Sequence, residues 1–252
     1  MPYILQQLVA QSGELCYNQG RRGADGVKRT FSQEWLKAIA CITMLADHVG
    51  AVFYPQFLWL RIIGRISFPI FCFLLVEGSA HTQNPPKYAI RLLIGAVLSE
   101  FSFDYLFFGG ITFRHQSVMV TLLIGFLMLR WMRRSNQILP VAVCFIAAEL
   151  LGADYGSRGI ALIWLFAMTR GGKHSFLTQG LVMALIFWQM SSTKLQIGFI
   201  QLPLQMLGLL ALIPISLYSG RKLSRNKWLQ WGFYLFYPLH LTILLAIVVL
   251  TR

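Results

Sequence analysis

Charged side chains are scarce in this sequence, and acidic ones are the scarcest. Only 12% of the 252 residues are charged, 9 of them are acidic, and 56% are hydrophobic. A soluble protein of this length needs more polar residues to cover its surface, so the composition excludes an ordinary soluble globule. It predicts a protein embedded in the lipid bilayer.

Cysteine is also sparse, and the usual signatures of soluble enzymes are missing. The four cysteines, Cys16, Cys41, Cys72 and Cys144, form no CxxC pair, and three of them fall within apolar runs. This spacing predicts neither a disulfide framework nor a metal site. The sequence contains no P-loop, GxGxxG, HExxH or GxSxG motif, so it gives no indication of the common nucleotide-binding or hydrolase classes.

The net charge of +13 would suggest a nucleic-acid partner in a soluble protein. Here the basic residues form short clusters between apolar runs, as the positive-inside rule predicts, so we expect no nucleic-acid partner. With a cytoplasmic N-terminus, sixteen of the 22 basic residues fall on the cytoplasmic side, four fall outside, and Arg61 and Arg65 remain within a helix. We therefore predict that the N-terminus is cytoplasmic.

Nine apolar segments follow a mixed N-terminal stretch. They cover approximately residues 34–54, 57–82, 86–108, 116–132, 137–152, 159–170, 174–190, 199–219 and 228–250. A membrane-spanning helix needs about 20 residues, and the fifth, sixth and seventh segments are short by this measure. We predict an all-α, polytopic integral membrane protein of about nine transmembrane helices, in which residues 1–32 form a cytoplasmic arm and residues 33–252 form the membrane domain.

The first apolar segment carries two ionisable residues, Asp47 and His48. An Asp at the centre of a membrane helix costs about 2.5 to 3.5 kcal/mol, so such residues indicate a functional site. Lys37 lies eleven positions before His48, which returns it to nearly the same helix face, with Met44 between them. The alternative is a lysine that reaches the interface and a polar pair that only hydrogen-bonds to neighbouring helices.

Further polar residues are predicted to lie at the depth of Asp47. The second helix returns inward with Arg61 and Arg65 one turn apart, and the third helix ends with Glu100 and Asp104. Near the same level lie Gln116, Glu149, Asp154 and Arg158. We expect the acidic residues to converge on the two buried arginines around a polar cavity. A purely structural ion-pair network is the alternative.

Four other features are weaker. Pro69 should kink the second helix below Arg65, and Glu77 lies toward the cytoplasmic entrance. Asp154 and the residues after it indicate a turn entering a helix. His240 lies near the middle of the last helix, where a hydrogen-bonded core residue is the usual interpretation.

The order and spacing of several segments resemble the TraX family. These segments are LKAIACITMLADHVGAVF, LRIIGRISFPIFCFLLVEG, LSEFSFD, QSVMVTLLIG, ADYGSRGIALI and FYPLHL. The resemblance covers about residues 31–245, with Ser117 where the family pattern has Asn and no counterpart for residues 1–30. The named member of the family acetylates the N-terminus of conjugative pilin. The resemblance implies a multi-pass acetyltransferase of the bacterial cytoplasmic membrane, with acetyl-CoA as the acyl donor and no metal.

The resemblance and the predicted placement of charged residues together indicate site residues. His48, Asp47 and Arg65 are expected to be catalytic. Residues expected to bind substrate are Lys37, Arg61, Glu77, Glu100, Gln116, Asp154 and His240. Basic residues near the cytoplasmic helix ends are expected to hold the phosphates of acetyl-CoA, namely Arg91, Arg130, Arg133 and Arg134, with Lys87 on the same face.

In the mechanism that this implies, His48 is a general base or carries the acetyl group, while Asp47 or a neighbour fixes the imidazole tautomer. Arg65 stabilises the oxyanion or anchors the acceptor. The acceptor is an amine or hydroxyl of pilin or of an envelope glycan or lipid. Two alternatives are a proton-coupled transporter of a small solute and a non-catalytic membrane scaffold.

Overall fold

The computed structural model describes residues 30–135, 138–172, 175–190, 194–197, 200–221 and 227–251. Most of the predicted N-terminal arm lies outside these residues. The elements are α2 (Gln33–Val52), α3 (Leu58–Gly64), α4 (Ser67–His81), α5 (Pro85–Phe108), α6 (Val118–Met132), α7 (Ile138–Leu150), α8 (Gly156–Met168), α9 (Ser175–Trp188), β1 (Lys194–Ile197), β2 (Ile200–Pro203), the 3₁₀ helix η1 (Leu204–Ala211), α10 (Leu212–Ser216) and α11 (Lys227–Thr251).

Local sequence signals account for several helix ends. The hydroxyl of Ser32 accepts a hydrogen bond from the backbone N–H of Trp35 at the start of α2. Asn84 caps α5 in the same way, and two prolines occupy its first turn, where no backbone donor is needed. Gly109 ends α5 in the left-handed conformation with φ 74°. These ends fall close to the predicted segment boundaries.

The second apolar segment is broken into two helices below Arg65, where a kink was predicted. Helix α3 ends at Gly64, and α4 begins at Ser67. Pro69 lies in the first turn of α4, a position that proline tolerates because the N–H group there has no partner within the helix. The break allows Arg65 to reach partners in two other elements.

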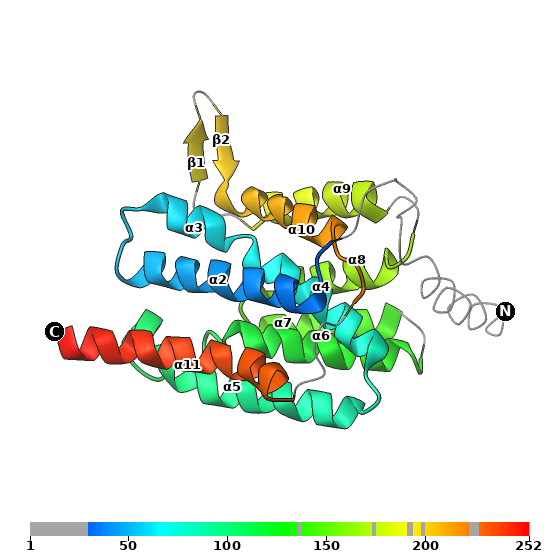
Figure 1. Ribbon diagram of the computed structural model, residues 1–252, viewed down its shortest axis with the longest axis horizontal. Helices are drawn as coiled ribbons and strands as arrows, with labels where there is room; N and C mark the ends of the chain where they lie inside the picture. Colours follow the sequence, from blue (N-terminus) through cyan, green and yellow to red (C-terminus); the bar gives the residue numbers. More distant parts are fainter. Residues whose placement is uncertain are drawn as a thin grey trace.

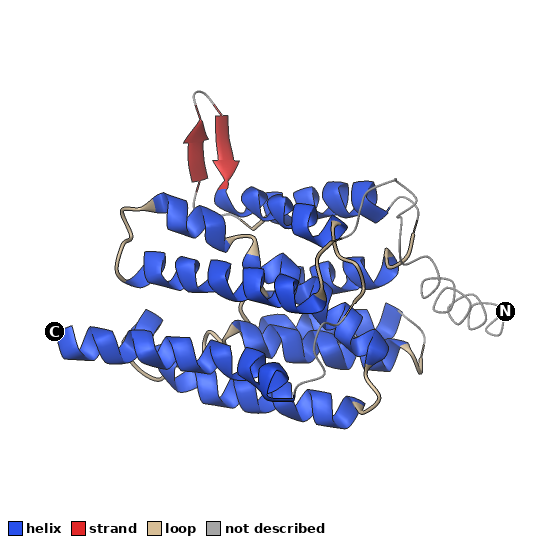
Figure 2. Cartoon of the chain, viewed as in Figure 1, coloured by secondary structure: helices blue, strands red, loops and turns tan. Residues whose placement is uncertain are grey.

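The eighth segment, residues 199–219, is not the single helix that was predicted. Residues Ile200–Pro203 form β2, which pairs antiparallel with β1 so that Gln196 lies opposite Gln201. The strands form a hairpin that projects from the helical bundle beside α3 (Figure 2). The chain then continues as η1 and α10, which pack against α9.

Helices α4, α6 and α8 form the centre of the bundle, and the other helices surround them (Figure 1). Their largest fully buried side chains include Ile70, Phe126 and Phe166. A methyl group on Gly125 would overlap Ile163, so this glycine allows α6 and α8 to approach closely, as small residues do between membrane helices. Helix α11 runs along α5 and also touches α2.

The outer helices expose large apolar side chains. In α9, for example, Leu177, Leu181 and Leu185 are all more than 60% exposed and lie on one face. In the part of the chain that the structure describes, three helical stretches are long and apolar enough to cross a membrane, namely Gln33–Val52, Leu58–His81 (α3 and α4 together) and Trp231–Thr251. Five shorter apolar helices accompany them. This surface points to a membrane protein, while the nine-helix count and the orientation stay predictions.

Candidate active site

Asp47 in α2 binds two arginines from the next segment. Its Oδ2 lies 3.0 Å from Nη1 of Arg61, and its Oδ1 lies 2.5 Å from Nη2 of Arg65. Arg65 also donates from Nη1 to Oε1 of Gln205 in η1, at 3.2 Å, and from Nε to the Arg61 carbonyl. The prediction that Asp47 reaches Arg61 or Arg65 is confirmed for both.

This cluster depends on a close approach of α2 and α3. A methyl group on Gly64 would overlap the Asp47 carboxylate, and one on Gly50 would lie 2.6 Å from the Leu60 side chain. The cluster holds one carboxylate and two guanidinium groups, so its local charge is positive. Two of the five N–H donors of Arg65 are not used by the contacts above. Such donors suit the stabilisation of a developing oxyanion.

His48 faces a different neighbour, His240 in α11. Nδ1 of His48 lies 2.7 Å from Nε2 of His240. The His48 ring also packs edge-on against Phe107 and Tyr237. Adjacent helix positions point about 100° apart, and among the described contacts none joins the Asp47 carboxylate to the His48 ring. Asp47 therefore binds the arginines rather than the imidazole.

A cavity of about 200 Å³ lies between α2, α4, α5, α6 and α11. Lys37 and Arg91 line it near the end of the bundle where α2 begins, and Met44 and Tyr237 line it deeper inside. Met44 lies one helical turn before His48, and the Tyr237 ring is 6.0 Å from the His48 ring. The deep end of the cavity therefore borders the histidine pair.

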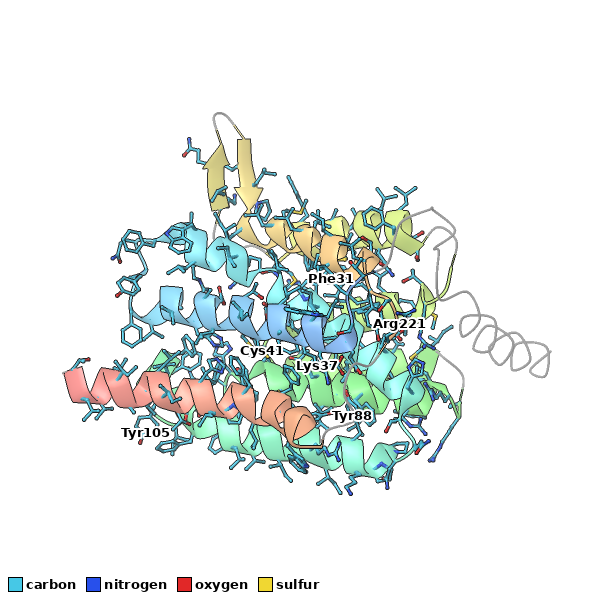
Figure 3. The ribbon with its side chains drawn as sticks, viewed as in Figure 1. Phe31, Lys37, Cys41, Tyr88, Tyr105 and Arg221 are labelled. Carbon is cyan, nitrogen blue, oxygen red and sulfur yellow. The ribbon has the colours of Figure 1, made fainter. Side chains whose placement is uncertain are left out.

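The walls of this cavity are largely apolar and aromatic. Tyr88, Tyr234 and Phe233 contribute rings, and the two cationic side chains lie over aromatic faces. The Nζ atom of Lys37 is 5.1 Å from the centroid of Phe233, and the Arg91 guanidinium is 5.8 Å from that of Tyr234. Lys37 and Tyr88 lie in the same half of the bundle, whereas Tyr105 lies toward the opposite end (Figure 3). The two cationic groups thus gather at one end of the cavity, which the carboxylate of Glu34 also lines.

The other predicted phosphate-binding residues, Arg130, Arg133 and Arg134, lie at the end of α6, outside the residues that line the cavity. Partial burial, followed by the charges of Arg130 and Arg170, lowers the pKa of Arg133. The guanidinium groups of Arg130, Arg133 and Arg170 are therefore close enough to repel one another on this surface. A cluster of this kind suits an anionic phosphate group.

Glu77, expected to bind substrate, forms an ion pair with Arg170 in the structure. Nε of Arg170 lies 2.6 Å from Oε1 of Glu77, and Nδ1 of His81 lies 3.7 Å from Oε2. Burial, with the charges of Glu77 and Glu34, raises the pKa of Tyr218 nearby, so this phenol stays neutral. Glu77 does not line the cavity, and the structure gives it a role in joining α4 to the end of α8.

The carboxylates expected at the depth of Asp47 mostly bind backbone amides. Glu100 accepts from the N–H of Ser117 at 2.9 Å, and Asp154 accepts from the N–H of Tyr155 at 3.1 Å. The other two such pairs are Asp104 with Thr112 and Glu149 with Ser157. Gln116 forms a backbone bridge to Ala153. Only Asp47 forms an ion pair with the buried arginines among the described residues.

Three residues in the contacts described above were not predicted from the sequence. Gln205 binds Arg65, Arg170 binds Glu77, and Tyr237 lies between the cavity and the histidines. Among the sequence motifs, FYPLHL, which contains Tyr237 and His240, was the one signal that could have indicated the position of Tyr237 next to the histidines. In the part of the chain described by the structure, no group of three His, Cys, Asp or Glu residues is arranged to hold a metal ion.

The fold and the site together define a helical membrane protein with a partly buried histidine pair, an arginine–aspartate cluster, and a cavity whose deep end, at Tyr237, borders the histidines. Comparison with known families gives a match over residues 32–248 to the family described as TraX protein. The chain belongs to the TraX family.

Individual relatives support this assignment. A probable fimbrial assembly protein FimC of Dichelobacter nodosus is 29% identical over 240 residues, covering 85% of this chain and 94% of the relative. An uncharacterized protein of Rickettsia prowazekii is 30% identical over 54% of this chain and 55% of its own length. Protein TraX of Escherichia coli is 24% identical over 51% of this chain and 52% of its own length. No solved structure matches the chain.

Proposed function

We propose that the chain is an acetyltransferase of the bacterial cytoplasmic membrane that moves an acetyl group from acetyl-CoA to an amine or hydroxyl of an envelope molecule. The observation that carries this proposal is the cavity between the cationic end of the bundle and the histidine pair. It places Lys37 and Arg91 at one end and Tyr237, in contact with His48, at the other. Acetyl-CoA matches this arrangement, because its nucleotide end is anionic and its reactive thioester end is neutral.

The size of the cavity also supports a binding mode in which only the thioester end of acetyl-CoA enters it. Pockets that enclose whole drug-sized ligands measure about 300 to 1,000 Å³, and this cavity measures about 200 Å³. The acetylated pantetheine arm of acetyl-CoA would enter it, and the nucleotide would lie outside. The phosphates would then bind the surface arginines, Arg130, Arg133 and Arg134 among them.

His48 and Arg65 have distinct roles in this reaction. His48 takes the proton from the acceptor N–H or O–H as that nitrogen or oxygen attacks the thioester carbonyl. Arg65 donates hydrogen bonds to the oxyanion of the tetrahedral intermediate. The C–S bond then breaks, and the CoA thiolate leaves and receives the proton. Asp47 holds Arg65 in place and balances part of the positive charge.

The names of the relatives support an acceptor in pilus assembly or another envelope component. One relative is named a fimbrial assembly protein, and another is named TraX. The interior charges favour an enzyme over a proton-coupled transporter, because a proton carrier must release its proton along a path. Asp47 and Glu77 are each held by arginine instead.

The test uses the purified full-length protein. Calorimetric titration should show binding of acetyl-CoA, and radiolabelled acetyl groups should move from acetyl-CoA to an envelope fraction. His48→Gln should lower the rate of transfer by about 10²- to 10⁴-fold, the usual contribution of a general base, with the Kd for acetyl-CoA unchanged. His115→Gln, an exposed histidine in the loop after α5, is the matched control and should leave both values unchanged.

Absence of acetyl-CoA binding to the folded wild-type protein would contradict the proposal. Full transfer by His48→Gln would contradict the role of His48. Mass spectrometry after acid quenching reports whether an acetyl group accumulates on His48, which separates direct transfer from an acetylated intermediate.

A further inference from the structure

The two histidines of the site meet in a geometry that defines their protons. Nδ1 of His48 lies 2.7 Å from Nε2 of His240, the ring planes differ by 6°, and the ring centroids are 5.0 Å apart. A nitrogen–nitrogen distance of 2.7 Å is closer than two stacked rings can approach. The rings therefore meet edge to edge in nearly one plane, as an N–H···N hydrogen bond requires.

The other nitrogen of His240 determines the direction of this bond. Nδ1 of His240 lies 2.8 Å from the carbonyl oxygen of Phe236, one turn earlier in α11. A carbonyl oxygen only accepts, so the proton of the neutral His240 ring is on Nδ1, and its Nε2 is an acceptor. His48 must then donate from Nδ1. The unprotonated nitrogen of His48 is therefore Nε2, which has no hydrogen-bond partner among the described residues.

We propose that His240 is a positioning residue, which fixes His48 in the Nδ1–H tautomer and so leaves Nε2 as the proton acceptor of the reaction. The inference rests on the proposed function of His48 as a base. It assigns to His240 the orienting role that a carboxylate has in many enzymes. Asp47 does not have this role, because both of its oxygens bind arginine.

The surroundings hold both rings in this arrangement. His240 is only 5% exposed and packs against Phe236 and Tyr237, at centroid distances of 5.0 Å and 5.5 Å. Phe107 covers the His48 ring at 5.6 Å. A flip of either imidazole would break one of the two hydrogen bonds, so the Phe236 carbonyl, His240 and His48 form a single ordered chain of hydrogen bonds.

The experiment compares the wild-type protein with His240→Phe and His240→Gln. Phe preserves the ring but removes the acceptor, whereas the Gln side-chain oxygen can replace it. Each protein is labelled with nitrogen isotope in histidine, and nitrogen NMR shifts report which ring atom carries the proton. The chain has five histidines, and the His48 signals are identified as those that His48→Gln removes.

In the wild type and in His240→Gln, we expect His48 to carry its proton on Nδ1. In His240→Phe this preference should be lost. For acetyl transfer, kcat should fall by about 10- to 100-fold in His240→Phe, the usual effect of removing an orienting partner, with KM for acetyl-CoA unchanged. His240→Gln should recover most of kcat.

An Nε2–H tautomer of His48 in the wild type overturns the inference whether or not any variant folds. Retention of the Nδ1–H tautomer, or of full kcat, in His240→Phe also overturns it. If the wild type transfers no acetyl group, the proposed function fails, and the NMR comparison alone decides whether His240 fixes the tautomer.

Discussion

Two adjacent residues, Asp47 and His48, show how far the sequence alone could define the site. Their 100° separation on a helix predicted different neighbours, and the spacing of Arg61 and Arg65 predicted the partner of Asp47, which the structure confirms. The partner of His48 is 192 positions away in α11. A contact at such a distance has no periodic signal, so a single sequence could not reveal it.

The charge cluster at Asp47 depends on the absence of a side chain at Gly64. We predict that Gly64→Ala lowers the free energy of unfolding by about 3 kcal/mol or more, because its methyl group displaces Asp47 and leaves buried charges unpaired. The control is Gly232→Ala in α11, where the added methyl group meets open space and should be neutral or stabilising. Denaturation in detergent measures both, and equal stability of the two variants would contradict this packing.

At the scale of elements, most helices could be predicted from the apolar segments. The 20 residues of α2 and the 24 of α5, for example, nearly coincide with the predicted segments 34–54 and 86–108. The hairpin was missed for an identifiable reason. Leu195 and Ile197 alternate with a glutamine, as do Ile200 and Leu202, and this period of two is typical of strands. Averaged over a longer window, Ile200 and Leu202 resemble the start of the apolar segment 199–219, and the β1 residues fall in the connection before it.

The start of α6 depends on a carboxylate from the preceding helix. Glu100 accepts from the backbone N–H of Ser117, which acts like a cap at the helix N-terminus. We predict that Glu100→Ala lowers the free energy of unfolding by about 1 kcal/mol, whereas Glu100→Gln, which keeps the accepting oxygen, has a smaller effect. Neither variant should change acetyl-CoA binding in calorimetry. A loss of binding in both, with stability unchanged, would show that Glu100 binds substrate.

For the molecule as a whole, the two ends of the bundle differ in chemistry. The end where α2 begins carries Lys37, Arg91 and the arginines after α6, and the opposite end carries the carboxylates that hold loop amides, such as Asp104. The distribution of basic residues predicted this asymmetry from the sequence. The cavity could not be predicted in the same way, because its walls come from five helices whose contacts depend on packing.

The short helices are the strictest test of the predicted topology. Helices α7, α8 and α9 have 13, 13 and 14 residues, so each is about 20 Å long, against a hydrocarbon core of about 30 Å. If each still crosses the membrane, four positions between α6 and β1 must alternate in exposure. We predict that single cysteines replacing Arg133 and Gly172 face the cytoplasm, and that those replacing Arg158 and Lys194 face outward.

The measurement uses a variant without the four native cysteines and an impermeant thiol reagent applied to intact cells. Arg158→Cys and Lys194→Cys should be labelled directly, whereas Arg133→Cys and Gly172→Cys should be labelled only after the membrane is opened. Arg133, Arg158 and Lys194 have exposed side chains, so burial would not explain a failure to label cysteines at these positions. Labelling after permeabilisation is the control for each variant. If Arg133→Cys and Arg158→Cys react from the same side, α7 does not cross, and α7 with α8 would then form a re-entrant pair. Such a result would contradict the nine-helix count while leaving the site between α2, α3 and α11 unchanged, because the contacts of His48 and Asp47 involve neither of these two helices.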